Sequence, residues 1–456
     1  MSTSLQRSSV NAKILRLSLP TMTGMLLQAL YDLVDMFWIG FISPSAIAAA
    51  TLFNTFFWMV EVLNEIVGTS SVSLISQSHG ANETQKRDRI SEQTLLFKFL
   101  LAVLGAVLLA LLLPSLFRLF TSDEAVQRYG LDYGMIRVLF LPLFFSSYSV
   151  NTIFRCTGDA KTPMKLMIGS AVLNMIADPL LMFDTIPGTS IPGAGWGIKG
   201  AAIATVGSIT LAFAIGFGLL LAGKSEVKLS FIGLITLDPP IAKQLFSIGA
   251  PSGAGLLLRN LSMALFLKMV ALHGTEAVAV AGIGFRIYSF GFMPGWGLSM
   301  GSGIVIGHAI GKNNIEEAKR AVVLTTVDCL LIVGVLALPI FLFPKQVLSL
   351  FMGGQQAGPI GIALMRTIAP ALLFSALNSG MGAAFTGAGK NKPLLLAGIV
   401  GQWGILVPCS LLATLVFPGS TVWLWAILLI ADGGELVSRF FFYRRLNWYK
   451  SRVRVD

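Results

Sequence analysis

The chain has 456 residues, of which 55% are hydrophobic and only 12% are charged, and its mean hydropathy is +0.77. Because a soluble protein carries about 25% charged residues, this composition excludes a soluble protein and indicates a polytopic membrane protein. The net charge of +11 does not indicate a nucleic-acid-binding protein, since the basic residues lie in short loops and at the termini.

Twelve apolar stretches along the chain are each long enough to cross roughly 30 Å of hydrocarbon as a helix. They span residues 15–41, 46–77, 94–117, 130–154, 164–184, 197–222, 245–271, 277–310, 321–344, 358–385, 394–417 and 420–443. We therefore predict an all-α membrane protein with twelve transmembrane helices. The N-terminal segment lacks a signal-peptide cleavage pattern, so we expect the first helix to be retained.

The connections between these helices alternate in charge. The N-terminal segment, every second loop and the C-terminal segment together contain 23 Lys and Arg residues, whereas the opposite loops contain only Arg118, Arg128, Lys199 and Lys345. Because cytoplasmic loops carry the excess of Lys and Arg, we expect both termini in the cytoplasm and the protein in the plasma (inner) membrane.

The sequence also repeats itself at a nearly constant offset. Three pairs of matching residues are 231 apart and a fourth pair is 230 apart: Pro20 with Pro251, Ala46 with Ala277, Gly80 with Gly311, and Pro163 with Pro393. This predicts two pseudo-symmetric six-helix lobes, residues 1–222 and 245–456, joined by a cytoplasmic linker at 223–244. Paired bundles of this kind place a substrate site between them.

The first helix carries two acids, Asp32 and Asp35, in its second half. A charged side chain near mid-membrane costs roughly 2.5 to 3.5 kcal/mol on insertion scales, and such residues usually face a cavity and handle ions or protons. Asp35 is therefore a predicted functional residue, whereas Asp32 either faces the cavity or lies near the water interface. Pro20, four turns before Asp35, is a predicted bend point.

The helix at 164–184 contains LNMIADPLLMF, in which Asn174 and Asp178 are four residues apart and share one face. Pro179 follows directly and frees a backbone carbonyl. This predicts an oxygen-rich pocket, where sodium takes oxygen ligands or the buried carboxylate takes a proton. Alternatively, Asp178 lies at the helix end near the outer interface.

Glu61 and Glu65 are also four residues apart, on the second helix. They either continue a polar face toward the cavity or pair with a basic residue of the other lobe, because buried charges are usually paired.

The helices of the second lobe contain basic residues instead. These either form ion pairs across the cleft or recognise an anionic substrate. The predicted cavity or interlobe residues are Asp32, Glu61, Glu65, Arg259 and Arg286, while Lys268 and Arg366 add to the basic character.

Motifs that suggest enzyme chemistry are weak. The segment GLLLAGKS at 218–225 fits a nucleotide-binding loop, but it ends a long apolar helix instead of joining a strand to a helix. The three His residues lie near helix ends, and the three Cys residues are far apart, without metal or redox spacing. We expect no enzyme activity, no cofactor and no metal beyond a sodium ion used for coupling.

With these features together, the chain resembles the multidrug and toxin extrusion (MATE) family of cation-coupled antiporters over essentially its whole length. The resemblance depends on LSLPTMTG, VDMFWIG, RCTGDAKTP, LNMIADPLLMF, GIKGAAIAT and the loops GANETQKR and GKNNIEEAKR. It implies a V-shaped pair of six-helix lobes. In the archaeal-like and DNA-damage-inducible-like branches the coupling ion is handled in the first lobe.

The resemblance also implies roles for single residues. The positions that match the coupling site are Asp35, Asn151, Asn174, Asp178 and Thr205, and Pro20 matches the proline at which the first helix bends. Another branch has acids in helices seven and ten, where this chain has Arg259, Lys268 and Arg366. This departure favours coupling through the first lobe.

The implied function is export of small amphipathic, cationic compounds in exchange for protons or sodium by alternating access. We expect a monomer whose partners are its substrates and the lipid bilayer, with no nucleic acid. The alternative within the same superfamily is a lipid-linked precursor flippase or an exporter of an anionic metabolite.

Overall fold

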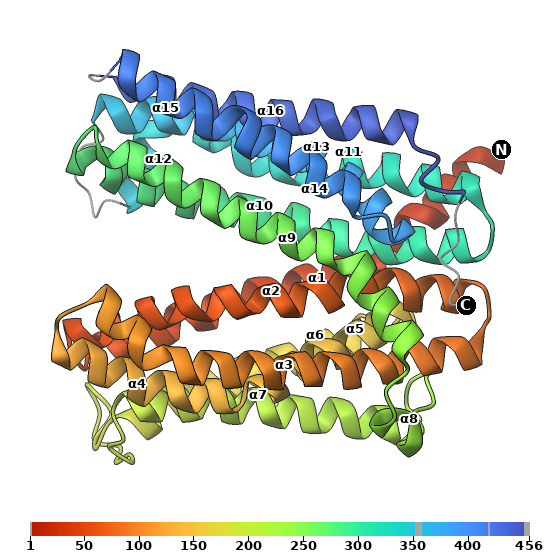
Figure 1. Ribbon diagram of the computed structural model, residues 1–456, viewed down its shortest axis with the longest axis horizontal. Helices are drawn as coiled ribbons and strands as arrows, with labels where there is room; N and C mark the ends of the chain where they lie inside the picture. Colours follow the sequence, from red (N-terminus) through yellow and green to blue (C-terminus); the bar gives the residue numbers. More distant parts are fainter. Residues whose placement is uncertain (1, 352–357, 418–419, 451–456) are drawn as a thin grey trace. The chain divides into compact units, whose positions relative to one another are not determined.

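The computed structural model describes residues 2–351, 358–417 and 420–450 (Figure 1). In these residues the regular structure is helical, apart from one isolated bridge between Thr185 and Pro192. The helices are α1 (Ser2–Gly40), α2 (Pro44–Gly80), α3 (Thr84–Phe120), α4 (Glu124–Leu139), α5 (Leu141–Cys156), α6 (Lys161–Met182), α7 (Ile198–Leu221), α8 (Phe231–Ile235), α9 (Pro239–Ala271), α10 (Thr275–Gly311), α11 (Ile315–Leu342), α12 (Pro344–Phe351), α13 (Pro359–Ala388), α14 (Lys392–Gly398), the π-helix η1 (Ile399–Leu406), α15 (Val407–Val416) and α16 (Val422–Arg445).

Each of the twelve predicted membrane spans has a helical counterpart. Within the described part of the chain, nine helices are long and apolar enough to cross a membrane, and the bent pair α4–α5 makes a tenth candidate. The two remaining predicted spans correspond to α1 and α16, which carry charged residues along their length. The prediction of an all-α polytopic membrane protein is confirmed.

Two spans depart from a regular α-helix. The predicted helix at 130–154 is broken at Phe140, where α4 and α5 meet at a bend of 50°. Pro142 follows the break, and it lacks the backbone N–H that would bond one turn back. The span at 394–417 contains the π-helix η1, and π-helical turns often occur at functional sites.

The described chain divides into two compact units, one made of residues 23–249 and the other of residues 2–22 with residues 250–450. The dividing points lie within α1 and α9, directly after Met22 and Gly249. The lobe boundaries at 222 and 245 stay a prediction.

In the unit of residues 23–249, α2 packs against α3, α4 and α5, while α7 packs against α4, α5 and α6. An aromatic core lies among these helices: the rings of Phe53 and Tyr133 meet edge to face at 5.4 Å, and those of Phe56 and Phe117 do so at the same distance. Such contacts stabilise beyond the burial of the rings alone.

In the other unit, α13 packs against α10, α11 and α16, and these helices run side by side in Figure 1. The start of α1 belongs to this unit. The Ser18 hydroxyl donates a hydrogen bond of 3.2 Å to the Leu298 carbonyl of α10, and a side chain at Gly301 would collide with Ser18. Glycine therefore allows the two helices to approach closely.

Candidate functional site

A polar cluster lies between α6 and α7 in the unit of residues 23–249. Asn174 and Asp178, both fully buried, face Thr205, which is 2% exposed. The Asn174 side-chain amide donates to Asp178 Oδ1 over 3.1 Å and to Thr205 Oγ1 over 3.4 Å. The i, i+4 spacing places the first pair on one face of α6, and the fold brings Thr205 to it.

Gly200 determines how closely α7 approaches α6 beside this cluster. A Cβ atom at Gly200 would lie 2.5 Å from the Leu181 carbonyl oxygen of α6. The Trp196 and Gly197 backbone amides also donate to the Leu181 and Met182 carbonyls, each over 2.9 Å. These contacts fix the start of α7 against the end of α6, about two turns before Thr205.

Asp35 lies on α1, 6% exposed, and is joined to α4 through a tyrosine. The Tyr133 hydroxyl donates to Asp35 Oδ2 over 3.3 Å, and Arg137 donates to the same hydroxyl over 2.8 Å. Asp35 and Asp178 are close enough to interact electrostatically. The structure thus brings together Asp35, Asn174, Asp178 and Thr205, four of the five predicted coupling residues.

Three buried oxygen atoms of this group have no hydrogen-bond partner among the described residues. They are Asp35 Oδ1, Asp178 Oδ2 and Asn174 Oδ1. Buried polar atoms are nearly always satisfied, so three unsatisfied acceptors in one group call for a bonding partner such as water, a proton or a cation. Oxygen acceptors with two carboxylates suit a proton or a hard cation.

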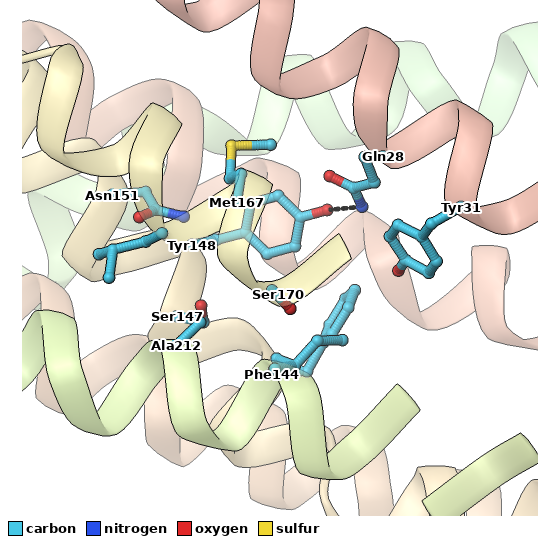
Figure 2. A pocket seen from close by; sticks show the side chains of 11 residues that line it. Gln28, Tyr31, Phe144, Ser147, Tyr148, Asn151, Met167, Ser170 and Ala212 are labelled. Carbon is cyan, nitrogen blue, oxygen red and sulfur yellow. Dashed lines mark hydrogen bonds between the residues drawn. The ribbon is translucent and has the colours of Figure 1, made fainter. Parts of the chain in front are cut away.

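The fifth predicted residue, Asn151 on α5, lies in an adjoining pocket. Figure 2 shows Tyr148 between Asn151 and Gln28 of α1, with the Gln28 side-chain amide donating to the Tyr148 hydroxyl over 3.1 Å. The pocket has a cavity volume of about 50 Å³. A water needs roughly 10–15 Å³ and a drug-sized ligand several hundred, so this pocket is large enough for water or a small ion and too small for a drug-sized ligand.

Arg137 was missed by the sequence analysis. Its guanidinium lies over the rings of Phe57, Tyr133 and Phe53 at 5.2, 5.4 and 5.6 Å, and it also lines a small pocket with Thr205. Arginine over aromatic faces is a favourable arrangement for a poorly hydrated cation. The only available signal was a basic residue inside the predicted helix at 130–154.

The other residues predicted in the first lobe are more scattered. Asp32 is exposed, and Pro20 lies in the interior of α1 among the residues grouped with the other unit. Glu61 accepts a hydrogen bond from Asn64, and Glu65 accepts one of 2.7 Å from Thr69. Both acids lie within electrostatic reach of Lys98, a base of the same unit.

The predicted contrast between an acidic first lobe and a basic second lobe is wrong. The residues 23–249 bury Lys98 and Arg155, and the other unit buries Asp432 and Glu435 on α16. Arg259, predicted as an interlobe residue, pairs with Glu435 of its own unit over 3.1 Å. This pairing reduces the cost of burying the Glu435 carboxylate. Arg286 is exposed.

The fold and this cluster define a polytopic, all-helical membrane protein with a buried acid–amide site inside one bundle. The MatE family model matches residues 20–180 and 251–412, which is more than half of the chain. The two matched segments start 231 residues apart, the offset of the internal repeat. The chain therefore belongs to the MATE family of transporters.

Individual relatives agree with this assignment. The chain is 27% identical over 395 residues to the probable multidrug resistance protein YoeA of Bacillus subtilis, covering 86% of this chain and 84% of that protein. It is 25% identical over 430 residues to the probable multidrug resistance protein NorM of Thermotoga maritima, covering 93% and 89%. A solved outward-facing structure of a multidrug resistance MATE family transporter has the same fold, with a TM-score of 0.88 at 24% identity and 98% coverage of both chains.

Proposed function

We propose that this protein is a secondary active antiporter that exports small amphipathic, cationic compounds in exchange for protons or sodium. The observation that carries the proposal is the buried cluster of Asp35, Asp178 and Asn174, which has three unsatisfied oxygen atoms inside the membrane-spanning helices. The multidrug resistance names of the relatives support the class of cargo.

The exchange follows from charge. A proton or sodium ion bound at Asp35 and Asp178 neutralises part of the cluster and weakens its attraction for a cationic substrate. Ion and substrate then become mutually exclusive, and substrate binding must weaken ion binding by the same factor. Alternating exposure of the site to the two sides of the membrane converts this competition into export.

A bend point in α1 and the orientation of the chain in the membrane belong to the same proposal. Pro20 lies inside α1 and lacks the backbone N–H of a helix-interior residue, so it supplies a bend point in this helix. We place the protein in the plasma membrane as a monomer, with both termini in the cytoplasm and Asn151 as a further coupling residue. No cofactor is required for exchange driven by an ion gradient.

Ethidium efflux from proteoliposomes tests this function, with proton and sodium gradients imposed separately. We expect efflux by the wild type under one gradient, and its loss in Asp35→Asn and Asp178→Asn. The matched control is Asp132→Asn, which removes an acid whose partner is the half-exposed Lys199, 3.2 Å away. Efflux by Asp35→Asn at the wild-type rate would exclude Asp35 from the mechanism.

A wild type that exports ethidium under neither gradient would contradict the multidrug proposal. The alternative would then be a lipid-linked precursor flippase or an exporter of an anionic metabolite. Repeating the assay with an anionic fluorophore separates this alternative from an inactive preparation.

A further inference from the structure

A second group of buried charges lies in the unit of residues 23–249, apart from the Asp35–Asp178 cluster. Lys98 on α3 is only 1% exposed, yet among the described residues it makes neither an ion pair nor a hydrogen bond. Its ammonium lies 5.8 Å from the ring centre of Tyr148 and within electrostatic reach of Glu61 and Glu65 on α2. Burying an ammonium without a direct partner is costly, and charged residues inside the membrane usually have a function.

Glu61 is the incompletely bonded acid of this group. One of its oxygens accepts a hydrogen bond from Asn64, whereas the buried Oε2 has no partner within the part of the chain that is described. Glu65, by contrast, is bonded to the Thr69 hydroxyl one turn further along α2. Glu61 therefore has an open acceptor at a buried position.

The fold does not require these charges. Helices α2 and α10 begin and end 231 residues apart, as the internal repeat predicts. The positions in the second repeat that correspond to Glu61, Glu65 and Lys98 are occupied by Phe292, Trp296 and Cys329. The corresponding positions of the second repeat thus carry no charge, although Trp296 is exposed there, and the absence of charge indicates that Glu61, Glu65 and Lys98 serve a function and not the fold.

Charged and titratable groups from three neighbouring helices and from α2 itself surround Glu61. Lys98 approaches from α3, Tyr148 and Arg155 belong to α5, and Glu65 lies on α2 itself. From α4, Arg137 faces α2 about two turns away, where it donates to Asn54 over 3.4 Å. With all groups ionised, the two glutamates balance Lys98 and Arg155.

Tyr148 connects this group to the pocket in Figure 2, because its hydroxyl accepts from Gln28 while its ring lies beside Lys98. We propose that Glu61, held near Glu65 and Lys98, forms a second proton-binding site of this transporter. One proton adds to a Glu61 carboxylate oxygen and leaves again to water. Its uptake changes the group from neutral to a net charge of +1, which repels a cation from the adjoining pocket. This role rests on the proposed antiport function.

Infrared difference spectra of the purified full-length protein between acidic and alkaline pH test the site without requiring transport. We expect the Glu61→Gln spectrum to lack one carboxylic-acid C=O band that persists in the wild type, in Asp35→Asn and in the exposed-acid control Glu124→Gln. A Glu61→Gln spectrum identical to that of the wild type would overturn the proposal. If Glu61→Gln does not fold, Glu61→Asp is measured instead. A carboxylic-acid C=O band at the same frequency as in the wild type would then contradict the proposed site.

Transport by the same variants separates this proposal from the proposed function. We expect proton-driven ethidium efflux by Glu61→Gln to fall to the level of liposomes without protein. The double variant Glu61→Gln/Lys98→Gln restores neutrality, so recovery of wild-type efflux in it would show that the group only balances charge. A missing band together with an inactive wild type would leave the proton site standing and would reject ethidium antiport.

Discussion

Arg137 donates a hydrogen bond of 2.8 Å to the Tyr133 hydroxyl, which in turn donates to Asp35 over 3.3 Å. The guanidinium nitrogen therefore lies no more than about 6 Å from the Asp35 carboxylate oxygen. A fixed positive charge at this distance competes with any cation that binds Asp35. Arg137 is thus part of the electrostatic balance of the proposed coupling site.

Arg137→Gln is expected to strengthen the binding of the coupling cation. At an effective dielectric constant of about 20, one charge at this distance contributes on the order of 3 kcal/mol, or about a hundredfold in affinity. Efflux should slow, because the cation is released less readily. The measurement is the dependence of substrate displacement on proton or sodium concentration.

Arg128→Gln is the matched control, since Arg128 is exposed on the same helix. It removes the same charge without touching the Tyr133 bond and should leave cation affinity unchanged. Equal cation affinity in Arg137→Gln and Arg128→Gln would show that Arg137 does not act on Asp35.

Thr205→Val should weaken cation coupling only moderately. The variant keeps the shape of the side chain but removes the oxygen that accepts the 3.4 Å hydrogen bond from Asn174. A hydrogen bond of this kind contributes about 0.5–1.5 kcal/mol, so we expect up to about a tenfold loss of cation affinity. Thr205→Ser restores the hydroxyl and should restore affinity. Failure of Ser to rescue would assign the effect to packing instead.

The sequence predicts those parts of this site that depend on local periodicity. The pairing of Asn174 with Asp178 follows from their i, i+4 spacing, and the twelve spans follow from apolar runs. The break at Phe140 is a different case, because Pro142 was visible in the sequence but prolines are tolerated inside membrane helices. Thr205 was found only through the family resemblance, since nothing local joins α7 to α6.

The buried bases could not be found in this way. Topology is inferred from Lys and Arg in loops, so a single base inside an apolar run, such as Lys98 or Arg137, passes unnoticed. The pairing of Arg259 with Glu435 joins residues 176 apart in sequence. Such a pair depends on how α9 packs beside α16, which the periodicity of either helix does not specify.

Gly200→Val should disrupt the contact between α6 and α7. The added side chain would collide with the Leu181 carbonyl oxygen, 2.5 Å from the position of Cβ. Overpacking of this kind typically costs about 1–3 kcal/mol, and the shift of α7 should also stretch the bond from Asn174 to Thr205. The unfolding temperature in detergent and the rate of ethidium efflux should both decrease. Gly207→Val on the same helix is the control, because a Cβ there meets open space.

Glu435 holds two arginines together in the other unit, and its removal should be strongly destabilising. Its carboxylate, 2% exposed, pairs with Arg259 over 3.1 Å and with Arg439 one turn along α16. Glu435→Gln removes the paired counter-charge of both guanidinium groups and leaves only Asp432 to interact with them. Breaking a fully buried pair typically costs about 3–5 kcal/mol, and the exposure of Arg259 reduces this cost. A lower unfolding temperature in detergent is the expected result.

Two controls for Glu435→Gln follow from the solvent exposure of the paired basic side chains. The Arg259 side chain is 42% exposed, so water compensates part of its charge and Arg259→Gln should be milder than Glu435→Gln. Lys13→Gln removes the 2.6 Å ion pair between Lys13 and Glu317. Because the Lys13 side chain is 53% exposed, this change should cost about 0–1 kcal/mol. If Glu435→Gln unfolds at the temperature of Lys13→Gln, the buried network does not stabilise this unit.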